Sequence, residues 1–155
     1  MRANLCLAVL LVTVLTMSAC VTDNSAVGEM LLSPGKSAVN SAQTATVADF
    51  VKSYSENAAK ANREYSRKWV KLRGIVTDVR KIEVFKGSSA TDYYIVGLKD
   101  DTKKTNQIMT CRFNFNKGSE VESLKAGTVA TILGQVDELD NTSSLPVLMN
   151  SSLVK

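Results

Sequence analysis

From residue 69 onward, apolar and polar residues alternate in five short segments that polar turns separate. A period of two places successive side chains on opposite faces of a strand, so each segment predicts a β-strand with one buried face. Glycines interrupt three of these segments, which indicates bulges or sharp bends. The predicted strands are Trp69–Val79, Asp92–Leu98, Ile108–Phe115, Thr128–Val136 and Leu145–Val154. Five short, bent strands favour a small closed barrel.

Two helical segments accompany the predicted strands. Thr46-Val47-Ala48-Asp49 has the spacing of a helix start, in which a threonine and an acid three residues later cap the first turn. Apolar residues then recur at helical spacing as far as Ala61, with charged residues on the opposite face. We predict an amphipathic helix that covers one end of the barrel. A membrane-surface helix is the alternative, but the apolar face has few bulky residues. A short helical turn is predicted at Ser119–Leu124.

The first 19 residues have the pattern of a secretory signal. Arg2 precedes the apolar run Leu5–Leu15, and small residues follow it. The run is shorter than the roughly 20 residues that cross a bilayer, so a membrane anchor or a buried helix is the weaker interpretation. The residues Met17-Ser18-Ala19-Cys20 resemble the lipobox of bacterial lipoproteins, with Met where that motif usually has Leu.

The lipobox resemblance implies cleavage before Cys20 and attachment of acyl chains such as palmitate to that residue. More than one acyl chain makes membrane attachment stable. Val21 rather than Asp follows the cysteine, a pattern that resembles sorting to the periplasmic face of the outer membrane in Gram-negative cells. The next residues are rich in Ser, Ala, Asn, Gly and Thr and have no sustained period. We therefore predict a signal peptide over 1–19, a flexible tether over 20–45 and a folded domain over 46–155.

The cysteines fit this organisation. Cys6 leaves with the signal peptide and Cys20 carries lipid, so the domain retains Cys111 and no internal disulfide. Cys111 alternates with Met109 and Phe113 in the third predicted strand, which indicates a buried thiol. A reactive thiol is the alternative, but no basic cluster or helix start lies nearby in the sequence to lower its pKa.

Two spaced motifs sharpen the prediction of a barrel. Trp69-Val70-x-Leu72-x-Gly74-x-Val76 covers the first strand, and Leu124-x-x-Gly127-x-Val129-x-x-x-x-Gly134-x-Val136 leads into the fourth. Together they resemble the tRNA_anti-like group of OB-fold proteins over about residues 47–154. The resemblance implies a mainly β fold: a five-stranded Greek-key barrel with an N-terminal helix and a short helix between strands 3 and 4. Another small barrel or a half-open sandwich is the alternative. Glycine and apolar spacings indicate fold better than function.

Composition excludes several classes of enzyme. The chain contains no histidine, so the commonest general base and the commonest metal ligand are missing. A Ser-His-Asp or Cys-His site cannot be built, and no metal-ligand cluster or Gly-rich phosphate loop is present. The pair Asp100-Asp101 falls in a predicted turn, where aspartate is expected for local reasons. We predict a protein that is not an enzyme, with no catalytic residue, metal or cofactor.

A binding role remains. OB domains that bind single strands combine a basic groove with aromatic rings on which bases stack. The candidate ligand-binding residues lie in the first three predicted strands and are Lys71, Arg73, Tyr93, Tyr94 and Arg112. We expect these charges to share a polar surface on the side of the second and third strands. The alternative is that the aromatic rings fill the barrel, with one tyrosine of the pair inside, and that the charges are merely solvated.

We therefore predict a lipid-anchored, non-enzymatic binding module of the cell envelope. It contacts the membrane through lipid on Cys20, and it binds an envelope protein or polymer. Binding of single-stranded nucleic acid is the alternative function. Loss of Arg2 lowers the formal net charge from +4 to only +3, and an exported domain rarely meets nucleic acid, so both observations argue against that partner.

Overall fold

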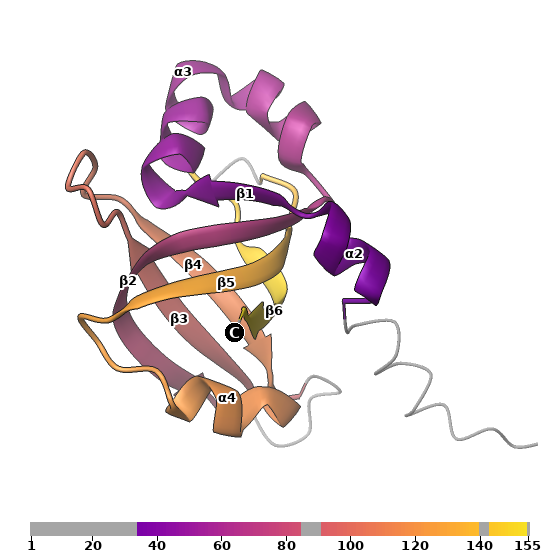
Figure 1. The fold of residues 1–155 in the computed structure, drawn as a ribbon, viewed down its shortest axis with the longest axis vertical. Coiled ribbons are helices and arrows are strands. Elements are labelled where there is room, and N and C mark those ends of the chain that lie inside the picture. The colour runs from indigo at the N-terminus through magenta and orange to yellow at the C-terminus, as the bar shows by residue number, and fades with distance from the viewer. Residues whose placement is uncertain (1–33, 85–90, 140–142, 155) are drawn as a thin grey trace, which may run out of the picture.

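The computed structural model describes residues 34–84, 91–139 and 143–154. The predicted signal peptide, Cys20 and the first part of the predicted tether lie outside these residues. Figure 1 shows the described elements wound into one unit. In chain order they are α2 (Lys36–Ser41), β1 (Gln43–Thr46), α3 (Val47–Tyr65), β2 (Trp69–Ile82), β3 (Tyr93–Lys99), β4 (Ile108–Asn114), the 3-10 turn η1 (Phe115–Lys117), α4 (Gly118–Glu122), β5 (Val129–Val136) and β6 (Leu148–Leu153).

The strands form a sheet that closes on itself. Their order is β1-β2-β3-β4-β6-β5, and β2 pairs with β5 as well. Closure is possible because β2 is long: Trp69–Ile75 pairs antiparallel with β5, and Ile75–Ile82 pairs antiparallel with β3. β4 meets β6 in parallel. The predicted five-stranded OB-type barrel, with an N-terminal helix and a short helix between its third and fourth strands, is confirmed for β2 to β6.

Glycines allow β2 and β3 to approach closely at two of the predicted bends. A Cβ on Gly74 would lie 2.6 Å from the carbonyl oxygen of Lys99. Gly97 faces the register shift between Val76 and Asp78 in β2, and a Cβ there would overlap the Thr77 hydroxyl. A side chain at either position would push β2 away from β3. The glycines that the sequence places inside strands are therefore needed for the bends of the barrel.

Apolar side chains from every barrel strand and from α3 fill one core. Its fully buried members include Phe50, Leu72, Val96, Met109, Cys111, Phe113, Ile132 and Leu148. The predicted buried position of Cys111 is confirmed, and burial raises the pKa of its thiol. A thiol that stays protonated and has no exposed surface is not a nucleophile.

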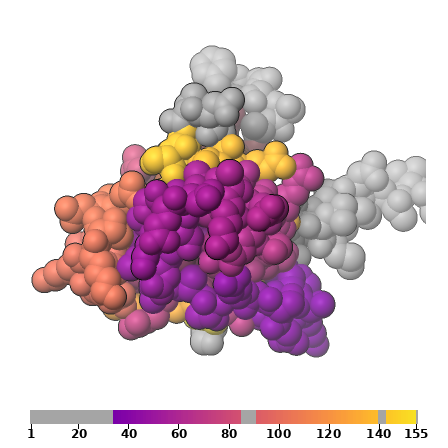
Figure 2. Space-filling model, turned by 90° about the horizontal axis from the view of Figure 1, so that it is seen from above, coloured from indigo at the N-terminus to yellow at the C-terminus, as the bar shows by residue number. Residues whose placement is uncertain are grey.

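The predicted helix over one end of the barrel is α3. It begins where the sequence indicates, because the hydroxyl oxygen of Thr46 accepts a hydrogen bond from the backbone N–H of Asp49 at 3.1 Å. Figure 2 shows α3 spread across this end, with α2 at its margin. The helix continues to Tyr65 and has one kink, at Asn57. The expected continuous apolar stripe is therefore divided between two shorter helical segments.

The structure differs from the predicted tether near residue 45. Residues 36–41 form α2, and β1 pairs in parallel with β2 from Gln43↔Val70 to Thr46↔Arg73. The prediction of a flexible segment up to residue 45 is therefore wrong for its last part. β3 pairs with the second half of β2, so the first half has an open edge that β1 fills. The four residues of β1 contain one apolar side chain, so the sequence has no alternation of apolar and polar residues that would predict this strand.

Candidate functional site

A shallow groove of about 230 Å³ crosses the outer face of β3 and β4. Residues at alternate positions of these strands face outward there, because Tyr94, Val96, Cys111 and Phe113 between them point into the core. The segments that follow β5 and run into β6 form the other wall. The lining residues are Tyr93, Ile95, Thr110, Arg112, Asp137, Val147 and Met149.

Arg112 stacks on Tyr93 at the centre of this groove. The guanidinium carbon lies 3.9 Å from the centroid of the tyrosine ring. The register explains the contact: Ile95 is opposite Arg112 and Tyr93 is opposite Asn114, so the two side chains are diagonal neighbours on one face. Cation–π attraction stabilises the pair. Within residues 34–84, 91–139 and 143–154, the contact with the Tyr93 ring is the one interaction that engages the guanidinium.

The rest of the groove is mainly apolar. Ile95, Val147 and Met149 contribute apolar surface, and Asp137 adds one carboxylate to oppose the single positive charge of Arg112. Small-molecule and peptide sites commonly combine apolar walls with a few polar groups that fix orientation. The groove therefore suits a ligand that presents both apolar and polar groups, rather than a uniformly anionic one.

The two tyrosines of the predicted site face in opposite directions. Tyr93 lines the groove, whereas Tyr94 is 9% exposed and belongs to the core. The ring of Tyr94 stacks beneath Phe115, with centroids 6.3 Å apart. The prediction that Tyr94 binds a ligand is therefore wrong, because consecutive residues of a strand cannot share a face. The alternative, with one tyrosine of the pair inside, is what the structure has.

Lys71 and Arg73 lie apart from the groove. They belong to the half of β2 that runs between β1 and β5, whereas Tyr93 is paired with Ile82 at the far end of β2. Arg73 also forms an ion pair with Asp101, with Nη1 and Oδ2 2.8 Å apart. The expected single surface of Lys71, Arg73 and Arg112 is therefore wrong. The sequence could not reveal that the first half of β2 pairs with β5 and the second half with β3.

The two aspartates after β3 have structural roles, as their position in a turn predicts. The Asp100 carboxylate is 2% exposed and accepts hydrogen bonds from Thr102 and from the backbone N–H groups of Lys104 and Thr105. Burial alone would raise the pKa of Asp100, but these hydrogen bonds hold it below its ordinary value. Asp101 holds Arg73. Neither carboxylate is arranged for acid–base chemistry.

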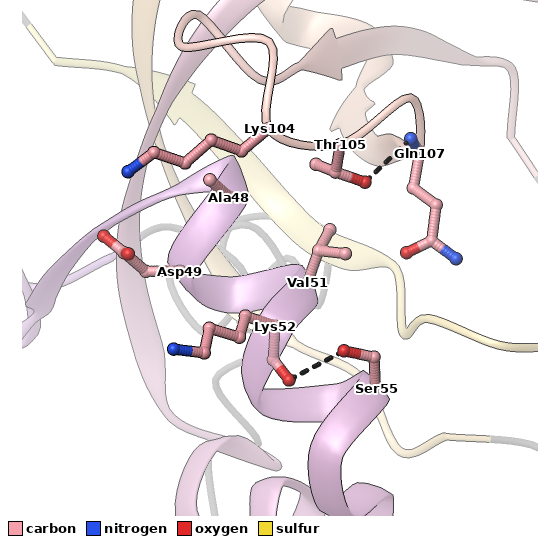
Figure 3. A pocket seen from close by; sticks show the side chains of 8 residues that line it. All are labelled: Ala48, Asp49, Val51, Lys52, Ser55, Lys104, Thr105 and Gln107. Atoms are coloured by element: carbon pink, nitrogen blue, oxygen red, sulfur yellow. Dashed lines mark hydrogen bonds between the residues drawn. The ribbon is translucent and has the colours of Figure 1, made fainter.

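A second hollow, of about 490 Å³, lies between α3 and the turn that precedes β4. Figure 3 shows Lys52 and Lys104 extending to one side of it and Thr105 and Gln107 lying on the other. Lys52 is also paired with Glu56 at 3.7 Å. Because its polar groups do not converge, this hollow is a weaker candidate than the groove.

Sequence reasoning missed five of the seven groove residues. Alternation could have found Ile95 and Thr110, which share outer faces with Tyr93 and Arg112. Asp137, Val147 and Met149 come from distant parts of the chain, and no local pattern links them to β3. No metal site accompanies the groove: residues 34–84, 91–139 and 143–154 hold no group of three His, Cys, Asp or Glu side chains that could bind an ion. Over the same residues, no helix combines the length and the apolar character needed to cross a membrane.

Comparison with known proteins gives two findings. The sequence profile of the tRNA_anti-like family matches residues 1–153. Six solved chains are similar to this one, among them a Klebsiella pneumoniae subsp. pneumoniae protein named a "putative nucleic acid-binding lipoprotein". That protein is 41% identical, with a TM-score of 0.69, and the match covers 79% of this chain and 99% of the Klebsiella chain. No curated protein matches.

Proposed function

The chain belongs to the tRNA_anti-like family of OB-fold proteins, and from that premise we propose that it is a lipid-anchored, non-enzymatic binding module of the cell envelope. OB barrels bind ligands across their second and third strands and the loop between the fourth and fifth. In this chain those strands are β3 and β4, and Asp137 and Val147 flank the corresponding loop. The groove around Tyr93 and Arg112 therefore occupies the usual binding position of the fold.

We propose that the groove binds a segment of an envelope protein or polymer. The stacked pair of Tyr93 and Arg112 within mainly apolar walls carries this proposal. The ring offers contact area with a polar tip, and the guanidinium can hold a carbonyl or carboxylate in two hydrogen bonds. A phosphate backbone that followed the groove would come close to the Asp137 carboxylate, which would repel it.

The proposed anchor is lipid on Cys20. The lipobox-like residues Met17 to Cys20 support it, and the Klebsiella relative is named a lipoprotein. In a Gram-negative cell the domain would hang from the periplasmic face of the outer membrane. The absence of histidine from the whole chain and the structural roles of Asp100 and Asp101 support a role in binding rather than catalysis.

Single-stranded nucleic acid is the second candidate ligand. Arg80 and Arg112 lie on either side of Ile95 in register, so two cations and the Tyr93 ring share one face. The name of the Klebsiella protein points the same way. Against this ligand, Arg80 is already paired with Asp78 at 2.7 Å.

Photo-crosslinking in cells tests the proposal. A photoreactive residue in place of Thr110, within the groove, should trap an envelope protein or a cell-wall fragment. Tyr93→Ala and Arg112→Ala should each remove that product, because they destroy the stacked pair. Arg63→Ala is the matched control: it removes an equal charge from the exposed face of α3 and should leave crosslinking unchanged.

An oligonucleotide titration separates the two ligands. Micromolar binding of a labelled single strand that weakens with salt and disappears in Arg80→Ala/Arg112→Ala would establish the second candidate. Retention of both the oligonucleotide signal and the crosslink in Arg112→Ala would show that the groove is not the site.

A further inference from the structure

Trp69 is the single tryptophan of the chain, and it lies outside the barrel core. It begins β2 on the outer face, half-buried, and lines a hollow of about 360 Å³ together with Ser41, Gln43 and Lys68. In the register with β5, Trp69 is paired with Gln135 and Lys71 with Leu133. Trp69 is therefore a diagonal neighbour of Leu133 in this register; Leu133 is buried, whereas Trp69 keeps part of its surface exposed. Tryptophan with one apolar side and one polar tip is the residue that proteins place at membrane–water interfaces.

Three lysines lie on the elements next to this hollow, and Lys68 lines it. Lys36 lies on α2, Lys68 precedes Trp69, and Lys71 follows on the same strand face. None of the three lysines forms an ion pair within the described parts of the chain. The neighbouring Arg67 is paired with Glu138 at 2.6 Å. We call this set, Lys36, Ser41, Lys68, Trp69 and Lys71, the α2 surface. It carries one aromatic ring and three positive charges that no ion pair within residues 34–84, 91–139 and 143–154 compensates.

The α2 surface lies where the described chain begins. The segment from Cys20 to Pro34 can span about 50 Å at most, even when fully extended. Figures 1 and 2 both show α2 on the side of the barrel away from the turn between β3 and β4. An acyl anchor on Cys20 would therefore attach the domain through its α2 side, from which the lysines can reach the headgroups.

We propose that the α2 surface lies against anionic phospholipid headgroups of the membrane that anchors the chain, with the Trp69 ring at the interface. The inference rests on the proposed lipid anchor. Positive side chains near an anionic bilayer are attracted to it over about one Debye length, and the anchor makes encounters within that range frequent. The domain is then oriented on the membrane rather than free to rotate about its tether.

The fluorescence of Trp69 reports this contact directly, because no other tryptophan contributes. The mature, acylated protein is reconstituted in vesicles of phosphatidylcholine alone or of phosphatidylcholine with phosphatidylglycerol. We expect phosphatidylglycerol to shift the emission to shorter wavelength and to make it quenchable by brominated lipid, and we expect added salt to reverse both effects. Flotation of the vesicles measures anchoring in the same samples.

Two triple variants test the lysines. Lys36→Gln/Lys68→Gln/Lys71→Gln should lose the shift and the quenching while it still floats with the vesicles. Lys99→Gln/Lys103→Gln/Lys104→Gln removes the same charge near the opposite side of the barrel and should behave like the wild type. Circular dichroism confirms that both variants are folded.

The outcomes separate the anchor from the orientation. Wild-type protein that floats but gives the same emission in both kinds of vesicle overturns the inference and leaves the anchor intact. The inference also fails if the two triple variants respond alike, or if the shift depends on protein concentration and not on lipid, which would identify a second copy of the chain as the occupant. Protein that fails to float refutes the anchor and the inference with it.

Discussion

Asn57 caps the second half of α3: its side-chain oxygen accepts a hydrogen bond from the backbone N–H of Lys60 at 2.9 Å. The backbone of Asn57 is extended at this point, with φ −159° and ψ 89°, so two helical segments meet there. With this kink, the centroid of the Tyr65 ring lies 5.0 Å from the centroid of the Phe50 ring. The kink at this exposed polar residue thus accompanies the packing of an aromatic cluster over the barrel.

The first prediction concerns this cap. Asn57→Ala should lower the free energy of unfolding by about 1 kcal/mol, because an exposed N-cap is lost while the kink is still required by packing. Asn57→Asp, which keeps the acceptor, should stay within a few tenths of a kcal/mol of the wild type. Chemical denaturation measures both. Equal stability of the alanine variant would mean that α3 can straighten without cost.

Tyr54 gives the second prediction. Its hydroxyl is buried and has no hydrogen-bond partner in the described part of the chain, and burial, followed by the nearby Tyr65, raises the pKa of Tyr54 from 10.0 to about 12. Tyr54→Phe removes an unsatisfied polar group, so it should raise the free energy of unfolding by about 1 kcal/mol.

The same group predicts a dependence on alkaline pH. The unfolded state loses the Tyr54 proton near pH 10 and the folded state only near pH 12, so wild-type stability should fall across that interval. Tyr54→Phe should lack this component. Thermal unfolding at a series of pH values measures it, with Tyr93→Phe, on the outer face of the barrel, as the control. A lower melting temperature for Tyr54→Phe at neutral pH would contradict the structure.

Asp100 supplies the third prediction, at acidic pH. Its folded-state pKa lies below the ordinary 3.8, so its stabilisation is present above that pH and is lost as pH falls through the lower folded value. Asp100→Asn should lower the melting temperature at neutral pH, because an amide cannot accept from all the N–H groups of the turn. The melting temperature of this variant should also fall less steeply than that of the wild type as the pH is lowered. Glu122→Gln, at an exposed site, should change neither.

The fourth prediction tests the bend between β2 and β3. Gly97→Ala should destabilise the fold by about 1–3 kcal/mol, since the added methyl would overlap Thr77 and Asp78. Gly35→Ala is the natural control, because nothing lies within 4 Å of a Cβ there. If urea unfolds the two variants at the same concentration, the close approach of the two strands is not needed for the barrel.

The fifth prediction concerns the anchor. Cys20→Ser should abolish incorporation of labelled palmitate and leave the precursor uncut before residue 20. Cys6→Ser, which changes another cysteine of the same N-terminal segment, should be labelled and processed as the wild type is. If Cys20→Ser still incorporated palmitate, the lipid would have to be attached to another residue.

Much of the barrel could be predicted because its strands are amphipathic. Alternation located all five barrel strands, and glycine spacing indicated their bends, since both features follow from burial on one face. The strand β1 and the kink at Asn57 escaped prediction for a common reason. Each depends on a partner that is not local: β1 on the open edge of β2, and the kink on the packing of Tyr65 against Phe50.

The candidate site was harder to predict than the fold. Tyr93 and Arg112 could be proposed from their residue types, but choosing between Tyr93 and Tyr94 required the register of β3. Arg73 and Arg112 are both arginines in predicted strands. Only the structure shows that β2 places Arg73 away from the groove. Asp137 reaches the groove from the end of β5, which β6 separates from β4, and spacing along the chain does not encode this strand order.

The pairing of β1 with β2 has a mechanical consequence. If the proposed anchor and the proposed ligand both hold the domain, tension between them would enter the fold through α2 and β1 before it reached the barrel. Only four residue pairs join β1 to β2, whereas seven join β2 to β5. We expect β1 to detach first under load and to lengthen the tether while the groove keeps its shape. Detachment of β1 would then relieve the force before the barrel and its bound ligand are disturbed.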